Sequence, residues 1–133
     1  MAIRYFIGDP CYVVKSEILE EFFRNFCDDI KTGDTMSFEY KGHTCFVSYT
    51  AHGDGIYDSD SGHRYAVDSG TICAIPLVPE LVQTPFLEES WSLDEEDITG
   101  RVVNKQIDRI GYEEGTIYFP YIGEAIHTDG WSD

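Results

Sequence analysis

The segment GDGIYDSDSGHRYAVDSG, residues 53–70, gathers the side chains of this sequence that are best suited to chemistry. Its eighteen residues include four glycines and four aspartates, namely Asp54, Asp58, Asp60 and Asp68. Closely spaced carboxylates can ligate a cation or share a proton as an acid–base pair. The segment is therefore a metal-binding loop, a catalytic carboxylate pair or a hairpin with a polar turn.

Asp58, Asp60 and Gly62 match the first half of a calcium-binding loop, D-x-D-x-G. The match ends there, because the twelfth position of such a loop requires a bidentate Glu and this chain has Ser69. The flanking runs GIY and HRYAV are typical of strands. Asp, Ser and Gly favour turns through side-chain-to-backbone hydrogen bonds and positive φ. We interpret the segment mainly as a hairpin that turns at SDSG.

Two aspartates, Asp9 in IGDPC and Asp68 in AVDSG, each end an apolar strand-like run. If they lie close together, they could share a proton or hold a metal. The structural alternative is that each accepts hydrogen bonds from backbone amides of its own turn, and we favour this alternative. A ligand-binding cleft, or a small enzyme, would use Asp9, Asp54, Asp58 and Asp68.

Other chemical motifs have little support in this sequence. His52 and His63 lie near the aspartates, but no His-x-His or His-x-x-x-His spacing occurs. Ser69 lies in DSGT without the G-x-S-x-G pattern of a nucleophile elbow, and no phosphate-binding glycine loop is present. We assign no catalytic residue, no metal ligands and no cofactor.

A second acidic stretch, EESWSLDEED at 88–97, holds six carboxylates in ten residues around a tryptophan. Carboxylates on a rigid scaffold can imitate the phosphates of a duplex and occupy a basic groove, with the tryptophan as an apolar anchor. A solvated loop is the alternative interpretation. The predicted partner-binding residues are Glu88, Glu89, Trp91, Asp94, Glu95, Glu96 and Asp97.

The elements that position these residues follow from the hydrophobic pattern. Residues 15–33 predict a helix that Ser16 can cap, with an apolar stripe at Leu19, Phe22, Phe23, Phe26 and Ile30. TMSFEY and HTCFVSYTA flank Lys41–Gly42 and predict a hairpin. TICAIPLV is an unbroken apolar run, typical of a central strand covered on both faces, and β-like runs resume after residue 100.

We therefore expect one domain over residues 1–133, with a long acidic loop at about 79–100. The expected fold class is α+β. One N-terminal amphipathic helix would pack on a bent antiparallel sheet of about five to seven strands.

The charge balance restricts the possible partners. Nine Lys and Arg against 25 Asp and Glu give a formal net charge of −16. Direct nucleic-acid binding and anionic membranes are disfavoured, because both require basic side chains, whereas a basic partner would be attracted. The four cysteines are widely spaced, which favours buried reduced thiols. Without a signal-peptide pattern or a long apolar run, we expect a cytoplasmic protein.

The stretches IGDPCYVV, GDGIY and YAVDSGTICAIP resemble small uncharacterised proteins of bacteriophages and bacterial mobile elements, over roughly residues 5–80. The resemblance provides no catalytic residues to transfer. It implies a phage-type inhibitor directed against a host defence protein, since small acidic phage proteins often block nucleic-acid-binding defence enzymes.

Three hypotheses about function follow. The first is an acidic interaction module that occupies a basic, nucleic-acid-binding surface of a host defence protein. The second is a small ligand- or metal-binding protein or enzyme that uses the aspartates of the 53–70 hairpin. The third is a structural subunit of a homo-oligomer. The sequence leaves the oligomeric state open, and we favour the first hypothesis.

Overall fold

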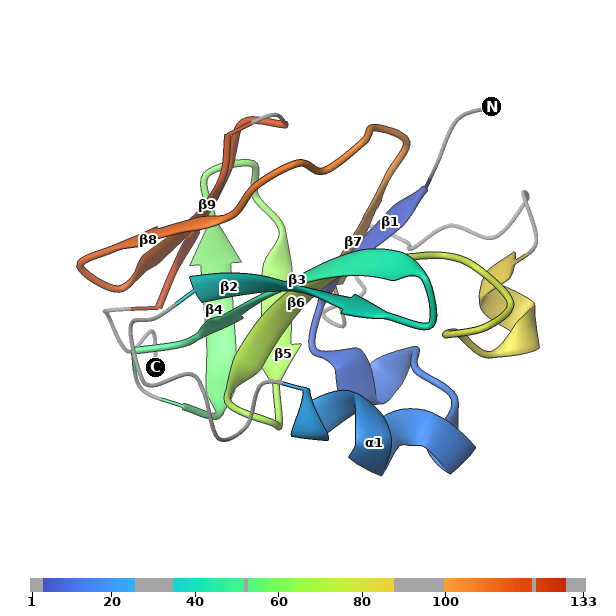
Figure 1. Ribbon diagram of the computed structural model, residues 1–133. Coiled ribbons are helices and arrows are strands. Elements are labelled where there is room, and N and C mark those ends of the chain that lie inside the picture. Colours follow the sequence, from blue (N-terminus) through green and yellow to red (C-terminus); the bar gives the residue numbers. More distant parts are fainter. Residues whose placement is uncertain (1–3, 26–34, 52, 88–99, 121, 129–133) are drawn as a thin grey trace.

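The computed structural model describes residues 4–25, 35–51, 53–87, 100–120 and 122–128. Over these ranges the chain forms ten strands, one short α-helix and three 3-10 turns. The strands make two antiparallel sheets of five strands each (Figure 1). The predicted α+β class is therefore confirmed. The predicted single sheet of five to seven strands is wrong, because the strands divide between two sheets.

The two sheets draw on strands from distant parts of the chain. In order across the first sheet, the strands are β2 (Thr35–Tyr40), β3 (His43–Tyr49), β6 (Thr71–Pro76), β1 (Tyr5–Gly8) and β7 (Gly100–Val103). In order across the second, they are β5 (Arg64–Val67), β4 (Gly55–Ser59), β10 (Glu124–His127), β9 (Thr116–Phe119) and β8 (Gly111–Glu113).

The first sheet is the middle layer. Short helical segments lie against one of its faces, and the second sheet packs on the other (Figure 1). In β6, Cys73 and Ile75 pack towards the helical side, while Ile72 and Ala74 pack towards the second sheet. Because both faces are covered, every residue of this strand is buried. The predicted central strand is confirmed.

The helical side is built from η1 (Pro10–Tyr12), η2 (Ser16–Ile18) and α1 (Leu19–Arg24). Phe22 of α1 is fully buried and meets the rings of Phe38 and Tyr40 edge-on, with centroid separations of 5.4 and 5.8 Å. A helix of six residues has little stability of its own, so this packing on β2 holds it in place.

The helix differs from its prediction. The residue before η2 is Lys15 and the residue before α1 is Ile18, and neither side chain makes a capping hydrogen bond. The expected cap at Ser16 is therefore wrong, because Ser16 lies inside the 3-10 turn. Phe26 and Ile30 of the predicted stripe lie outside the described residues.

The hairpin predicted at Lys41–Gly42 is confirmed, because β2 and β3 pair in register on either side of it. Lys41 has φ 51° and Gly42 has φ 82°. Positive φ at both central residues is the signature of a type I′ turn, whose twist matches that of the flanking strands.

The thiols of Cys45 and Cys73 are buried and free, and Cys11 is partly exposed and free. Burial raises the pKa of Cys45 to about 12. Cys27 lies outside the described residues. Among the helices of the described ranges, none combines the length and the apolar character that crossing a membrane requires.

Candidate functional site

The hairpin of β4 and β5 carries the aspartates that the sequence singles out. Tyr57 pairs with Tyr65 and Asp58 with Arg64, and the chain turns between them at residues 60–63. The predicted hairpin is confirmed. Side chains alternate along it, so that Tyr57 and Tyr65 are buried in the core while Ile56 and Asp58 face solvent.

All four aspartates of this hairpin segment, Asp54, Asp58, Asp60 and Asp68, are exposed. Ile56 lies on the same outer face and is 39% exposed, although it is a large apolar side chain. Asp58 lies within β4 and shares its outer face with Ile56, opposite Arg64, whereas the other three aspartates lie beyond the strand ends. The hairpin therefore presents exposed acids around Ile56.

Two of these carboxylates contact basic side chains on the surface. Oδ1 of Asp58 lies 3.3 Å from Nε of Arg64, and Oδ1 of Asp60 lies 2.7 Å from Nε2 of His127. All four side chains are substantially exposed. Ion pairs of this kind contribute about 0–1 kcal/mol, so a basic partner protein can replace them at little cost.

The hairpin does not form a calcium loop. Asp58 contacts Arg64 on the neighbouring strand, whereas Asp60 contacts His127 on β10. In the part of the chain that the structure describes, no group of three or more His, Cys, Asp or Glu side chains is placed to hold a metal ion. His52, which might have joined such a cluster, lies outside that part.

Of the four aspartates in the hypothetical cleft, the structure brings Asp9 and Asp68 together. The carboxylate of Asp9 is fully buried at the end of β1. Its Oδ1 accepts a hydrogen bond from the amide of Cys11 at 2.9 Å, and its Oδ2 accepts from the amides of Asp68 and Ser69 at 2.7 and 2.6 Å. Asp9 thus fastens its own turn to the turn between β5 and β6. Its bond to Cys11 is the structural role favoured from the sequence, whereas the bonds to Asp68 and Ser69 cross to another turn, and the carboxylate of Asp68 accepts from the hydroxyl of Tyr12.

The neighbours of Asp9 are held in their protonated forms. The carboxylate of Asp68 accepts a hydrogen bond from the hydroxyl of Tyr12 at 2.5 Å, and this bond, together with burial, raises the pKa of Tyr12. Burial and a side-chain interaction with Asp9 raise the pKa of Cys11 to about 12. A thiol in this environment is a poor nucleophile, because only the thiolate reacts.

A second buried carboxylate, Glu124, joins three other parts of the chain. It accepts hydrogen bonds from the hydroxyl of Tyr65 at 2.6 Å, from Oγ of Ser61 at 2.8 Å and from Nη1 of Arg101 at 3.1 Å. Burial alone would raise its pKa. The hydrogen bonds from Tyr65 and Ser61 and the charge of Arg101 outweigh burial, so the pKa lies below the usual 4.5.

Sequence reasoning missed Glu124. The residue stands in the run GTIYFPYIGEAIH, and an acid among so many apolar residues was the available signal. Its partners lie 63, 59 and 23 positions away along the chain. No local pattern could connect them.

Ser61 also touches a histidine, since its Oγ lies 2.7 Å from Nδ1 of His63. A serine, a histidine and a glutamate are therefore in contact, but Ser61 lies between the other two and hydrogen-bonds to both His63 and Glu124. In a catalytic triad the histidine stands between nucleophile and acid and accepts the proton of the nucleophile. Here Ser61 donates directly to Glu124, so the three side chains fix the hairpin turn to β10.

The predicted partner-binding residues lie outside the described residues. These are Glu88, Glu89, Trp91, Asp94, Glu95, Glu96 and Asp97. Fourteen of the 25 acidic residues are described, and eight of the nine Lys and Arg. The net charge of the described part is therefore much smaller than that of the whole chain. Among the described residues, the acidic surface that bears on function is the one on the hairpin and its surroundings.

No family model, curated protein or solved structure matches this chain significantly. The resemblance to bacteriophage and mobile-element proteins therefore stays a prediction. The function has to follow from the geometry and the charge of the residues.

Proposed function

We propose that this protein is a non-enzymatic interaction module whose acidic surface binds a basic surface of another protein. The observation that supports this most directly is the outer face of the β4–β5 hairpin. Four exposed aspartates lie along two paired strands and the turns that flank them, with Ile56 exposed among them. Acidic residues around an apolar centre suit a protein interface, where charge guides the encounter and apolar contact slows dissociation.

The rigidity of this face strengthens the proposal. The turn at residues 60–63 is tied to β10, because the amide of Asp60 donates to the carbonyl of Ala125 at 3.0 Å and Ser61 donates to Glu124. At the other end, Asp9 holds the amides of Asp68 and Ser69. A fixed array of carboxylates loses little conformational entropy on binding.

The buried carboxylates argue against the ligand-binding alternative. Both oxygens of Asp9 accept backbone amides, and the carboxylate of Glu124 accepts donors from three side chains. The carboxylates of Asp9 and Glu124 are therefore already occupied by hydrogen-bond donors of the protein itself. The exposed carboxylates of Asp58, Asp60 and Asp68 have partners at the surface, and a basic protein would have to replace them.

For the partner we propose a nucleic-acid-binding protein, with a host defence protein as the specific case. Carboxylates held at fixed positions on a surface can take the places of phosphates in a basic groove. The acidic segment 88–97 would extend this surface and add Trp91 as an anchor.

The test combines affinity capture from the native host with salt titration of the purified complex. We expect the complex to weaken markedly between about 0.01 M and about 0.15 M NaCl, over which the Debye length falls from about 30 Å to about 8 Å. A hairpin variant then locates the surface. It combines Asp54→Asn, Asp58→Asn, Asp60→Asn and Asp68→Asn.

The matched control removes the same number of charges elsewhere on the exposed surface. It combines Glu17→Gln, Glu20→Gln, Glu113→Gln and Glu114→Gln. We expect the hairpin variant to bind about tenfold more weakly and the control to stay within about twofold. Equal losses in the two variants would show that net charge acts without a defined face. Affinity that does not change with salt would contradict the proposal.

A third variant tests the segment 88–97 by neutralising its six acids together. If that variant alone loses binding, the interface lies on the segment and not on the hairpin. If it binds like the unmodified protein, the segment plays no part in the interface.

A further inference from the structure

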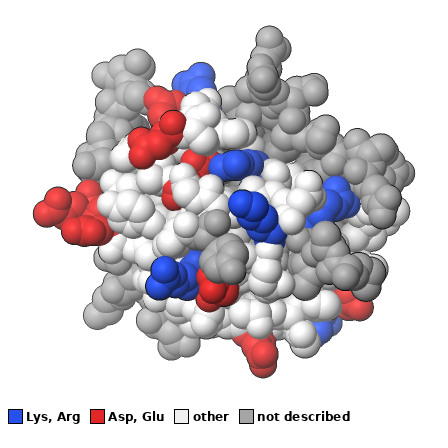
Figure 2. Space-filling model, turned by 90° about the horizontal axis from the view of Figure 1, so that it is seen from above, with Lys and Arg blue, Asp and Glu red and all other residues white. Residues whose placement is uncertain are grey.

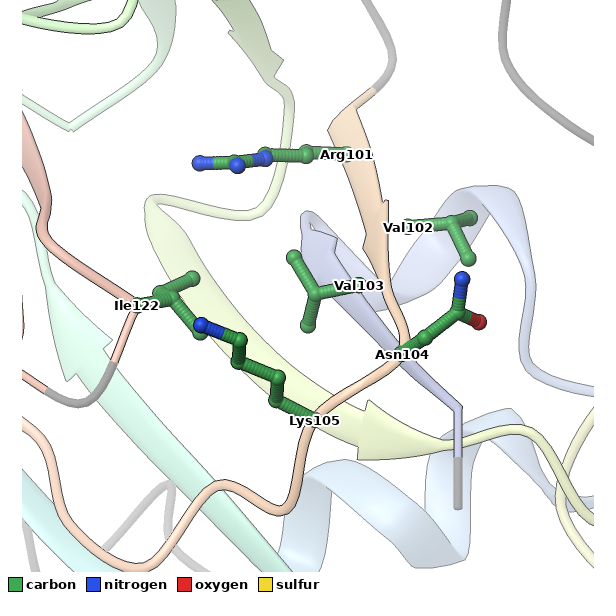
Figure 3. Close-up of a pocket in the computed structure, with 6 residues that line it drawn as sticks. All are labelled: Arg101, Val102, Val103, Asn104, Lys105 and Ile122. Carbon is green, nitrogen blue, oxygen red and sulfur yellow. The ribbon is translucent and has the colours of Figure 1, made fainter. Parts of the chain in front are cut away.

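A pocket of about 290 Å³ lies beside β7, and none of its lining residues belongs to the β4–β5 hairpin. Its lining residues are Arg101, Val102, Val103, Asn104, Lys105 and Ile122. Figure 3 shows Arg101, Val103 and Lys105 pointing to the side of the strand that faces Ile122, while Val102 and Asn104 point the other way. This follows from the alternation of side chains along an extended chain. The pocket thus has two cations that flank an apolar floor.

The charge of this pocket is unusual for so acidic a chain. Figure 2 shows Lys and Arg side chains close together near the middle of one face. Two of the nine Lys and Arg in the sequence line this one pocket, and none of its lining residues is acidic. Among the described residues, Lys105 has no ion-pair partner. Because the charge of Arg101 is balanced by the buried Glu124, Lys105 supplies the net positive charge of the pocket, and this charge favours an anion although the whole chain repels it.

Arg101 is held in a fixed orientation. One edge of its guanidinium donates through Nη1 to Glu124, which is fully buried and is itself fixed by Tyr65 and Ser61. Within the described residues, this is the one side-chain acceptor that Arg101 meets, so further N–H groups of the guanidinium are left for a ligand. Because the buried carboxylate of Glu124 already orients the guanidinium, the side chain of Arg101 loses little rotamer entropy when a ligand binds.

We propose that this pocket binds a small molecule with an oxyanion group, either a carboxylate or a phosphate ester. Arg101 would donate to two of its oxygens, and Lys105 would supply the neutralising charge. The apolar part of the ligand would rest on Val103 and Ile122. The volume lies at the lower limit of ordinary ligand pockets, which limits the ligand to a small metabolite. This inference is independent of the proposed protein interface, because the two rest on different residues.

The test uses the isotope-labelled full-length chain and records amide chemical shifts during titration. The probes are benzoate, phenyl phosphate and inorganic phosphate, with benzyl alcohol as the uncharged counterpart. We expect both aromatic anions to shift the amides of residues 101–105 and of Ile122 and to saturate. We expect benzyl alcohol to leave those amides unshifted.

Variants test the contribution of Lys105 to the binding. Lys105→Gln changes an exposed side chain that forms no ion pair with the residues the structure describes, and it is expected to weaken binding about fivefold. Lys105→Arg should restore it. Arg109→Gln is the matched control, because Arg109 lies four positions further on, is exposed and does not line this pocket; its affinity should stay within about twofold. Melting temperatures verify that each variant is folded.

Each outcome decides the matter. Saturable binding of phenyl phosphate but not of benzoate assigns the pocket to phosphate esters, the reverse assigns it to carboxylates, and binding of both assigns it to oxyanions in general. The proposal fails if no anion shifts these amides, if benzyl alcohol shifts them equally, or if Arg109→Gln weakens binding as much as Lys105→Gln.

Discussion

The two buried carboxylates, Asp9 and Glu124, hold together segments that are distant in sequence. Removing a carboxylate from water is costly unless donors replace the lost hydration. Asp9 receives three backbone amides, and Glu124 receives two hydroxyls and a guanidinium. In each case the donors come from at least two segments. The charge therefore helps to specify which segments meet.

For Glu124 this arrangement predicts a pH dependence of stability. A pKa that is lowered in the folded protein means that the ionised form stabilises the fold above the ordinary value of 4.5. The stabilisation is lost as the pH falls below 4.5 through the lower pKa of the folded state. We expect Glu124→Gln to lower the free energy of unfolding at pH 7 by about 1–3 kcal/mol, because Arg101, Tyr65 and Ser61 lose a charged acceptor.

Denaturant unfolding at a series of pH values checks this prediction. The difference between the unmodified protein and Glu124→Gln should shrink as the pH is lowered below 4.5. The exposed Glu113→Gln is the control and should change stability little at any pH. A difference that stays constant down to low pH would contradict an ionised Glu124.

At the scale of elements, the contact between β1 and β7 depends on a glycine. Gly100 begins β7 opposite Gly8 of β1. A Cβ at Gly100 would lie 2.3 Å from the carbonyl oxygen of Ile7 and 2.7 Å from Cζ of Phe6. Neither neighbour has room to move, because Phe6 and Ile7 are fully buried. The two strands can therefore approach this closely only with glycine at this position.

We expect Gly100→Ala to lower the free energy of unfolding by about 1–3 kcal/mol, the usual cost of overpacking. Gly111→Ala provides the comparison, because a Cβ there would lie 3.9 Å from its nearest neighbour, Cβ of Tyr118. Thermal and denaturant unfolding of both variants measures the difference. Equal stability of the two would show that β7 can shift away from β1.

Many of the strands and turns could be predicted from the sequence, because each has a local sequence pattern. Alternation identified the strands around Lys41–Gly42 and the hairpin at 53–70, and the unbroken run at 71–76 identified a strand covered on both faces. The division into two sheets could not be predicted. It depends on pairings between distant strands, such as β1 with β7, which alternation does not encode.

The candidate site shows the same limit. Asp9 was recognised because a turn signal, Asp-Pro, follows an apolar strand. Its bonds to Asp68 and Ser69 span about 60 positions and required the fold. The pocket cations Arg101 and Lys105 carried no sequence signal, since two basic residues separated by three others are common on any exposed strand.

For the whole molecule, the net charge of −16 predicts that salt stabilises the fold. Repulsion among the carboxylates opposes the compact state, and added salt screens it. We expect the melting temperature at pH 7 to rise by about 4 °C or more between about 0.01 M and about 0.15 M NaCl, which corresponds to about 1 kcal/mol. Differential scanning calorimetry measures the shift.

KCl at equal ionic strength separates screening from specific ion binding. The same rise with both salts is the signature of screening. A rise with one salt alone would instead indicate a cation site, and a fall in melting temperature with both would contradict the electrostatic argument.

The position of β1 between β6 and β7 has a consequence for biosynthesis. During synthesis β1 must stay unpaired on one side until residues 71–76 have been made, and on the other until residues 100–103 have followed. Folding is therefore dominated by contacts between distant residues, which makes it slow. The nascent chain exposes an apolar strand during this interval, and such a strand is prone to aggregate until its partners have been made.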